Sequence, residues 1–505
     1  MIEAETVPAL LVAIPILLAA LPIVLGIKLE RTGWTVAVGT CAVLFAASLA
    51  LATTVYGRGE AVEHELGGFP REVGILLLAD ELSTIVTVLV TGTALAVLVY
   101  TRVGGPRGNT FYSGYLLLVG GLLGLTLTND VFNMFVFLEI TGLATYALIA
   151  TGDGPESAIA SLKYLVLGTV GASIYLIGVG LLFMATGTLN MLELATAIPE
   201  AEGGYDNTLI RASFAFVFVG FAIKVAQWPV HAWQPDAYQH APDGVTPLIA
   251  ALVSTVSAYA LGRVLFTAYT VEFLEVVPVA ATAVVAVGSV SVVAGSILAV
   301  IQRDVKRMLA YSSVSQFGLI VAAYGLATET ALVGAIVHLV GHGLMKAGLF
   351  LAVGVIALGT GARTVREYAG LAKDQPVPAA VVAVLLIALV GIPPSVGFVG
   401  KWYIAVGAVE AEVWTVAAVI FLSTVLTLGY AARLLEAMYF TPARESRLPD
   451  DSLGGVMATD GGRRGDVTPG MLVVLVVIAL LAVALGFAGG LFFDLLEPFT
   501  AEVFE

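Results

Sequence analysis

Three ionisable side chains are spaced four residues apart in the stretch from Ala331 to Gly354: His338, His342 and Lys346. Residues four apart lie on one face of an α-helix, so the two imidazoles and the amine form a file along roughly two turns. The stretch is apolar and long enough to cross a bilayer. Ionisable groups at membrane depth are costly and mark ion or proton pathways by default, and histidine titrates near neutral pH. The spacing therefore predicts proton exchange inside a membrane helix.

Two further lysines lie in apolar stretches close to prolines. Lys224 precedes Pro229, and Lys401 follows Pro393 and Pro394. Proline ends or kinks a helix because it has no backbone N–H and its ring clashes with the preceding turn, so each lysine is expected beside a break in a membrane helix. Interrupted helices at corresponding places in two halves of a chain are typical of transporter repeats. The alternative is that these prolines only shape helix packing, since proline is common in membrane helices.

Glu139 lies deep inside an apolar stretch, and the sequence has no other acidic residue at that depth. A carboxylate beside a buried lysine has its charge stabilised, while burial opposes charge on both groups. Such a pair changes between ionised and neutral forms by moving one proton. We predict that Glu139 and Lys224 form this pair.

Each of these residues also has a structural interpretation. Lys401 is compatible with an amine that reaches the membrane interface, and Lys224 with a structural partner for a carboxylate. Taken singly, His338 and His342 are compatible with core histidines that donate to the backbone. Glu139 and its lysine are compatible with a static ion pair, although buried pairs often add little net stability. The alignment of three ionisable groups on one helix favours a proton relay.

The composition indicates a membrane protein with many spans. Of 505 residues, 59% are hydrophobic and 12% charged, against a charged fraction of about 25% in soluble domains. The single cysteine, Cys41, excludes an internal disulfide. The net charge of −14 lies largely in predicted loops, which fits life in high salt and equally an ordinary solvated loop surface. The sequence shows neither a basic patch for nucleic acid nor a glycine-rich nucleotide loop, and we expect no cofactor and no metal site.

Hydropathy predicts fourteen membrane helices, centred near residues 17, 44, 92, 120, 140, 174, 220, 256, 288, 318, 343, 390, 424 and 481. The expected fold class is an all-α polytopic membrane protein with two five-helix repeats and with helices seven and twelve broken. The second repeat must be inverted because each repeat has an odd number of spans. We predict N-terminal helices with an outer polar segment in 1–110, the repeats in 111–270 and 271–440, and a cytoplasmic loop with the last helix in 441–505. The polar segment from Tyr56 to Glu81 is expected to form a small hairpin, and the first apolar stretch, Val7 to Ile27, a retained helix.

Arginine and lysine predict the orientation in the membrane. Sixteen of the 23 basic residues, Lys306 among them, fall in odd-numbered loops, and three fall in even-numbered loops. Positive residues concentrate on the cytoplasmic side, so we expect a multi-pass protein of the cell membrane with both termini outside. Arg263 is expected near a helix end. This leaves Lys224, Lys346 and Lys401 inside the membrane.

The sequence contains five long motifs in order, which are NDVFNMFVFLEI, SLKYLVLGTVGASIYLIGVGLLFMATGTLNM, HAWQPDAYQHAPDGVTP, DVKRMLAYSSVSQFGLI and GIPPSVGFVGKW. Taken together, they resemble the antiporter-like membrane subunits shared by complex I, membrane-bound hydrogenases and Mrp-type cation/proton antiporters. The stretch around SLKYLVLG is most similar to the D subunit of Mrp antiporters, whereas HLVGHGLMK is closer to complex I and hydrogenase members. The resemblance covers the fourth to the thirteenth predicted helix.

The resemblance implies a proton path across the middle of the membrane. Glu139 and Lys224 match the coupled pair of the family, Lys401 matches its terminal lysine, and the file from His338 to Lys346 matches its central relay. The chain departs from the pattern on the eighth helix, where Thr255 stands at a position that is usually lysine or histidine.

The departure at Thr255 leaves a gap between Lys224 and His338. Hydroxyl groups cluster there, on Ser254, Thr255, Ser257 and Tyr259. Thr255 and Tyr259 share one helix face, and we predict that they line a hydrated gap, because hydroxyls both donate to and accept from water. The alternative is a unit that conducts protons poorly.

The sequence therefore predicts a proton-translocating subunit of a multisubunit Na⁺/H⁺ antiporter, most similar to the D subunit of the Mrp type. One alternative is a proton-pumping subunit of a complex I-like oxidoreductase or hydrogenase, in which other subunits hold the redox centres. Another is a non-conducting scaffold subunit. The expected partners are other subunits of such a complex, protons, Na⁺ and the lipid bilayer, and no nucleic acid.

Overall fold

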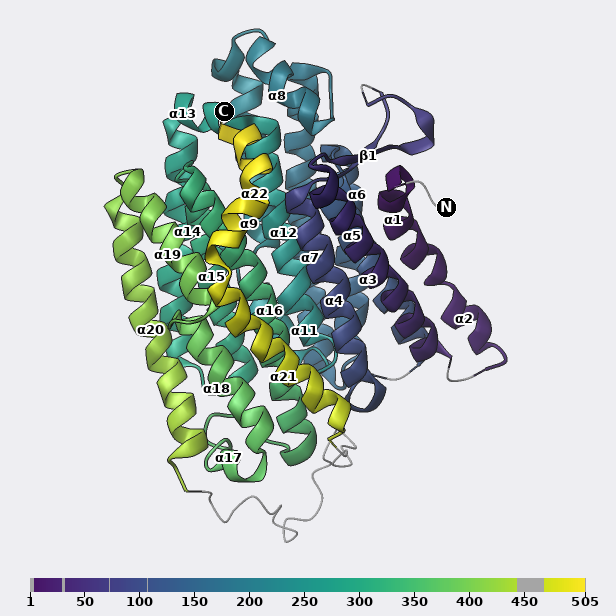
Figure 1. Ribbon diagram of the computed structural model, residues 1–505, viewed down its shortest axis with the longest axis vertical. Coiled ribbons are helices and arrows are strands. Elements are labelled where there is room, and N and C mark those ends of the chain that lie inside the picture. Colours follow the sequence, from purple (N-terminus) through teal and green to yellow (C-terminus); the bar gives the residue numbers. More distant parts are fainter. Residues whose placement is uncertain (1–3, 30–31, 72, 107, 443–466, 505) are drawn as a thin grey trace.

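The computed structural model describes residues 4–29, 32–71, 73–106, 108–442 and 467–504, and within these ranges the chain is a bundle of long helices with one small hairpin (Figure 1). The predicted cytoplasmic loop at the start of segment 441–505 lies mostly outside the described residues, because residues 443–466 are not among them. The first helices begin and the last helix ends toward the face of the bundle that carries the hairpin (Figure 1).

The N-terminal part consists of helices and a hairpin. They are η1 (Ala4–Thr6), α1 (Val7–Leu18), α2 (Leu21–Gly26), α3 (Gly33–Arg58), β1 (Val62–Glu65), η2 (Leu66–Gly68), β2 (Leu76–Ala79) and α4 (Glu81–Gly104). β1 pairs antiparallel with β2, with Val62 opposite Ala79. The hairpin predicted in this polar segment is confirmed. The side chain of Asp80 accepts from the backbone of Ser83 and caps α4, as N-cap carboxylates commonly do.

The first repeat and its outer segment come next. The elements are α5 (Asn109–Leu127), α6 (Val131–Ile149), α7 (Pro155–Thr186), α8 (Met191–Glu200), η3 (Gly204–Asp206), α9 (Thr208–Lys224), α10 (Trp233–His240), α11 (Thr246–Leu248), η4 (Ile249–Val253), α12 (Ser254–Arg263), η5 (Val264–Tyr269) and α13 (Thr270–Val276). Elements α11 to α13 form one span in which η4 and η5 are π-helical turns. Such turns are rare and often lie at functional sites.

The second repeat and the C-terminal helices complete the chain. The elements are α14 (Pro278–Ile301), α15 (Val305–Tyr324), α16 (Glu329–Thr360), α17 (Leu371–Asp374), α18 (Pro376–Val390), α19 (Val396–Glu410), α20 (Trp414–Tyr439), α21 (Pro469–Ala484), η7 (Leu485–Phe487) and α22 (Gly489–Phe504). α21 runs obliquely across the bundle and contacts α16 and α18 (Figure 1). The sequence did not indicate α22, whose Thr500 donates to Glu329 at the start of α16.

All fourteen predicted helix centres fall on helices. Within the described ranges, eleven of the spans are long and apolar enough to cross a bilayer. Three spans remain. The seventh (α9) and the twelfth (the pair α18–α19) are shortened by breaks, and the tenth is α15, whose first turn carries Lys306 and Arg307. The predicted all-α fold class with broken seventh and twelfth helices is confirmed.

The inversion of the repeats is visible in two corresponding helices. α7 and α16 each have 32 residues. α7 leads to α8 at one face of the bundle, whereas α16 leads to α17 at the opposite face (Figure 1). The two repeats therefore run in opposite directions across the membrane. The residue limits of the four predicted segments stay predictions.

Glycines bring the broken twelfth helix against α16. A Cβ atom on Gly400 of α19 would lie 2.6 Å from the Cβ atom of His338, and one on Gly407 would lie 2.6 Å from the backbone nitrogen of Ala331. Real Cβ atoms do not approach so closely, so these positions require glycine for the two backbones to meet. This close packing holds Lys401 on α19 beside the file of ionisable residues on α16.

Candidate functional site

Lys224 is the last residue of α9, and its Nζ lies 3.6 Å from Oε1 of Glu139 on α6. The lysine side chain is 5% exposed and the glutamate side chain 25% exposed. Pro229 lies in the break between α9 and α10. Trp233, the first residue of α10, donates from Nε1 to the carbonyl oxygen of Ile223 at 2.8 Å, which fixes α10 to the end of α9. The structure thus brings Glu139 and Lys224 together, as the sequence predicts.

Lys401 lies at the second break. Its Nζ donates to the carbonyl oxygens of Leu389 and Val390, at 3.1 and 3.0 Å. The last carbonyls of a helix have no partner within the helix and carry a partial negative charge, so they suit an amine. Gly391 ends α18 with φ +90°, a conformation that favours glycine. Pro393 and Pro394 follow it within the break. The buried position of Lys401 does not fit an amine at the membrane interface.

The file on α16 is fully buried. His338, His342 and Lys346 are each 0% exposed. His338 donates from Nε2 to Oε1 of Gln316 at 2.8 Å. Lys346 donates from Nζ to the carbonyl oxygen of Leu309 at 2.7 Å and to Oγ of Ser312 at 2.5 Å. Both polar partners, Gln316 and Ser312, lie on α15, and the sequence analysis missed them although their four-residue spacing places them on one helix face.

His342 lies between the two bonded members of the file. Its ring centroid is 6.5 Å from that of His338 and 4.7 Å from that of Phe317, whose ring forms a T-shaped pair with it. Neither ring nitrogen of His342 has a partner among the residues that the structure describes. A neutral imidazole has one donor and one acceptor nitrogen, and in His342 both are open to a further partner.

Thr255 and Tyr259 do not share a hydrogen-bonded site. The Tyr259 hydroxyl donates to the carbonyl oxygen of Thr126 on α5 at 2.8 Å, while Oγ1 of Thr255 is buried and has no partner in the described part of the chain. A small cavity of about 10 Å³ lies beside Tyr259 and Leu339, close to the volume that one water molecule needs. The hydrated gap lined by both residues stays a prediction.

A polar cluster next to Thr255 was not identified from the sequence. Gln234 donates from Nε2 to the Tyr238 hydroxyl at 3.0 Å and to Oγ of Ser254 at 3.2 Å. The two hydroxyl oxygens are 2.9 Å apart. The available signal was the polar run WQPDAYQH, which begins four residues after Pro229 and interrupts an otherwise apolar region.

Known proteins share this arrangement of helices and motifs. A family model described as NADH:quinone oxidoreductase/Mrp antiporter, TM, matches residues 128–427. The chain belongs to this family. It is therefore a multi-pass membrane protein, and the resemblance predicted from its motifs is confirmed.

Relatives from both branches of the NADH:quinone oxidoreductase/Mrp antiporter family are similar over most of their length. The N subunit of the NADH-quinone oxidoreductase of Desulforudis audaxviator is 39% identical over 464 residues, 89% of each chain. The D subunit of an Na⁺/H⁺ antiporter of Bacillus subtilis is 31% identical over 403 residues, 79% of this chain and 80% of the other. A chain of the membrane-bound sulfane sulfur reductase, an archaeal respiratory membrane complex, superposes with a TM-score of 0.87 at 29% identity, covering 99% of this chain and 98% of the other.

Arg263 is the last residue of α12, as expected for a residue near a helix end, although the membrane span continues beyond it. Arg263 is buried within the span from Thr246 to Val276, and its Nη2 is 2.5 Å from Oδ2 of Asp80. The side chains are 4% and 8% exposed. The pair borders a cavity of about 460 Å³. The span continues past Arg263 because the π-helical turn η5 follows α12 without a break.

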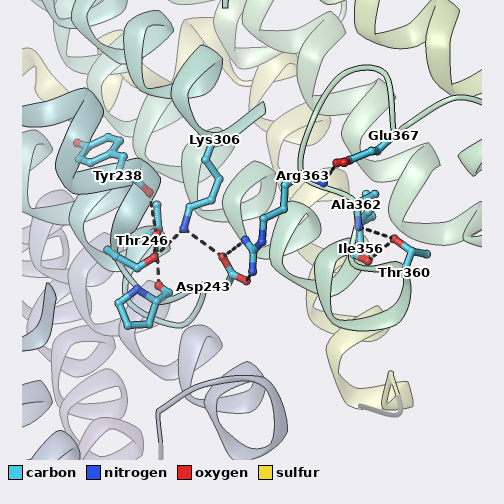
Figure 2. Close-up of polar contacts among 11 residues, drawn as sticks. Tyr238, Asp243, Thr246, Lys306, Ile356, Thr360, Ala362, Arg363 and Glu367 are labelled. Atoms are coloured by element: carbon cyan, nitrogen blue, oxygen red, sulfur yellow. Dashed lines mark hydrogen bonds and ion pairs between the residues drawn. The ribbon is translucent and has the colours of Figure 1, made fainter. Parts of the chain in front are cut away.

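Lys306 was expected in a cytoplasmic loop but lies buried in the first turn of α15 (Figure 2). Its Nζ is 3.0 Å from Oδ1 of Asp243 and donates to the carbonyl oxygen of Ala241 at 2.7 Å. Arg363, in the loop after α16, binds both carboxylate oxygens of Asp243, at 3.2 and 3.0 Å. Burial raises the pKa of the Asp243 carboxyl, but Lys306 and Arg363 lower it by more, so this pKa lies below its usual value. The cluster joins the first repeat to the second.

Proposed function

We propose that this chain translocates protons along the buried line that runs from Glu139 and Lys224, through the file on α16, to Lys401. The observation that carries the proposal is the pair of Glu139 and Lys224 at 3.6 Å, at the end of a broken membrane helix. Ionisable groups inside a membrane are costly and face protein or water. A line of such groups is readily explained if they exchange protons.

The contacts support a stepwise transfer. A proton that moves from Lys224 to Glu139 leaves two neutral groups, and its return restores two charges that attract each other. On α16, His342 separates Lys346 from His338, and each of these has a polar partner on α15 that holds its donor group in place. Gly400 sets α19 against His338, so Lys401 is the next group beyond the file. Each group is thus positioned to pass a proton to the next one.

We propose that the chain acts as a subunit of a multisubunit Na⁺/H⁺ antiporter of the cell membrane, with both termini outside. The similarity to the D subunit of an Na⁺/H⁺ antiporter and the concentration of basic residues in odd-numbered loops support this assignment. The 39% identity to the N subunit of an NADH-quinone oxidoreductase supports a second candidate, a proton-pumping subunit of a complex of that kind. In either complex other subunits are partners of this chain.

The test is proton flux in sealed vesicles that carry the complete complex. Flux driven by added Na⁺ supports the antiporter, and flux driven only by a redox substrate supports the second candidate. We expect Glu139→Gln and Lys224→Ala to abolish flux without preventing membrane insertion, because each removes the switchable charge. Glu193→Gln is the matched control, because Glu193 forms a surface ion pair with Arg71 at 3.1 Å, outside the buried line. Near-normal flux in either line variant would mean that the pair is structural.

A further inference from the structure

The span that contains α12 lies between Lys224 and the file on α16, and it has no lysine, histidine or acidic side chain at their depth. α12 packs against α9, which ends at Lys224, and against α16, which carries the file. From Thr246 to Gly262, Tyr259 is the one titratable residue in the sequence, and its hydroxyl is turned to Thr126. We propose that the cluster of Gln234, Tyr238 and Ser254 is the proton bridge between Lys224 and the file on α16. This inference rests on the proposed function and specifies one step of it.

The cluster is buried and its three members contact one another. Gln234 and Ser254 are each 0% exposed, as is Tyr238. The amide nitrogen of Gln234 donates to both hydroxyl oxygens, and these oxygens are 2.9 Å apart. Buried polar side chains are costly unless they are bonded, so a core that served packing alone would favour apolar residues at these positions.

The cluster lies between Lys224 and Lys346, and contacts connect it to both sides. On one side, Trp233 precedes Gln234 and is bonded to the carbonyl of Ile223, the residue next to Lys224. On the other side, the ring of Tyr238 meets the ring of Phe350 edge-on at 5.7 Å, and Nζ of Lys346 lies 5.9 Å from the centroid of the same ring. The Tyr238 side of the cluster therefore adjoins the Lys346 end of the file.

Thr255, the residue after Ser254, packs against α16. A Cβ atom on Gly343 would be 2.9 Å from the carbonyl oxygen of Ala251 and 3.6 Å from Cγ2 of Thr255. Gly343 follows His342 directly, so α12 and α16 touch at the level of the unpartnered imidazole. The bridge therefore differs from the Thr255–Tyr259 gap that the sequence predicts, because it enters the file between His342 and Lys346.

In the proposed bridge, the hydroxyls of Tyr238 and Ser254 pass the proton, and the amide of Gln234 orients them. A hydroxyl both donates and accepts, and either oxygen of the Tyr238–Ser254 bond can be its donor. Ser254 Oγ takes a proton from the Lys224 side as its own proton passes to Tyr238 Oη, and the proton of Tyr238 leaves toward Lys346. One O–H bond forms and one breaks at each oxygen, so neither residue keeps a charge. Rotation of both hydroxyls then restores the starting arrangement.

Gln234 is a positioning residue in this scheme. Its Nε2 donates to both hydroxyl oxygens, so the two hydroxyl protons point elsewhere. The Tyr238 hydroxyl has Ser254 Oγ at 2.9 Å and, more weakly, the carbonyl oxygen of Ile249 at 3.5 Å as acceptors. Oε1 of Gln234, like Oγ1 of Thr255, is buried without a partner in the described ranges. Each of these oxygens can accept a bond from a water molecule that links the cluster to the next group.

The test compares proton flux in vesicles that carry the complete complex, at equal amounts of assembled complex. We expect Tyr238→Phe to lower flux about a hundredfold or more, the typical loss when a group that transfers a proton is removed. Gln234→Leu should lower flux by less, because it removes the donor that orients the two hydroxyls but leaves both hydroxyls in place. The matched control is Tyr269→Phe. Tyr269 forms a similar buried pair with Ser213, at 2.7 Å, away from the line, and we expect its variant to keep wild-type flux.

A rescue experiment separates conduction from structure. Thr255→Lys adds an amine beside the bridge, and we expect it to restore most of the flux when combined with Tyr238→Phe. Wild-type flux in Tyr238→Phe would overturn the bridge, and so would a loss that Thr255→Lys does not restore. In both cases the proposed function stands if Glu139→Gln still abolishes flux, and it falls if Glu139→Gln has no effect.

Discussion

The break between α9 and α10 gives Lys224 a carboxylate partner, whereas the break between α18 and α19 gives Lys401 two backbone carbonyl oxygens. At the first break a proton can move between two side chains and cancel both charges. At the second break the carbonyls hold an ammonium but cannot take its proton. Inverted repeats with the same helix geometry thus place a switchable pair at one end of the line and a single proton-exchanging group at the other.

The largest expected effect is on the free energy of unfolding, which should respond differently to the loss of Lys224 and to the loss of Lys401. Lys224→Met leaves the Glu139 carboxylate without its cation, which we expect to cost roughly 3 kcal/mol. The double variant Lys224→Met/Glu139→Gln should recover most of that loss, because no charge is left unpaired. Thermal unfolding of the purified complex measures the recovery, and flux should stay absent in both variants.

Lys401→Met provides the comparison. Its loss leaves the carbonyls of Leu389 and Val390 unsatisfied, and we expect Glu139→Gln to restore nothing when combined with it. If Glu139→Gln restored stability equally in the Lys224→Met and Lys401→Met variants, the proposed difference between the two breaks would be contradicted.

A second prediction concerns Asp243, which holds two cations where Glu139 holds one. Asp243→Asn should destabilise the complex by roughly 2 kcal/mol at pH 7, with the half-exposed Arg363 contributing less than Lys306. Because the folded pKa of Asp243 is lowered, its contribution is fully present above its unfolded pKa of about 4 and is lost as the pH falls through the folded pKa. The difference between variant and wild type should therefore shrink below about pH 4, measured by unfolding at several pH values. A difference that grows in acid would exclude this role.

The smallest expected effect is at Thr255. Thr255→Val removes an oxygen that has no protein partner in the described residues, so the expected loss of flux is about twofold, well below that of Tyr238→Phe. Assembly should be normal, because valine has the same shape. A loss as large as that of Tyr238→Phe would place the bridge on the Thr255 face of α12, as the sequence predicts.

The sequence predicted the elements that depend on local chemistry. The breaks follow from prolines, the file on α16 from four-residue spacing, and the hairpin from a polar segment between apolar helices. The ion pairs of Arg263 and Lys306 could not be predicted because their partners, Asp80 and Asp243, are distant in the chain. Gln234 was missed for a similar reason, since its role depends on Ser254 of a different helix.

The central claim is that protons cross between the two repeats, and Lys346 tests it most directly. Lys346→Met keeps the length of the side chain, removes its proton-exchanging amine, and leaves both helix breaks unchanged. In vesicles with the complete complex, we predict that proton flux falls to the level of Glu139→Gln while assembly is normal. Wild-type flux in Lys346→Met, with none in Glu139→Gln, would confine the proton route to one repeat and contradict the account.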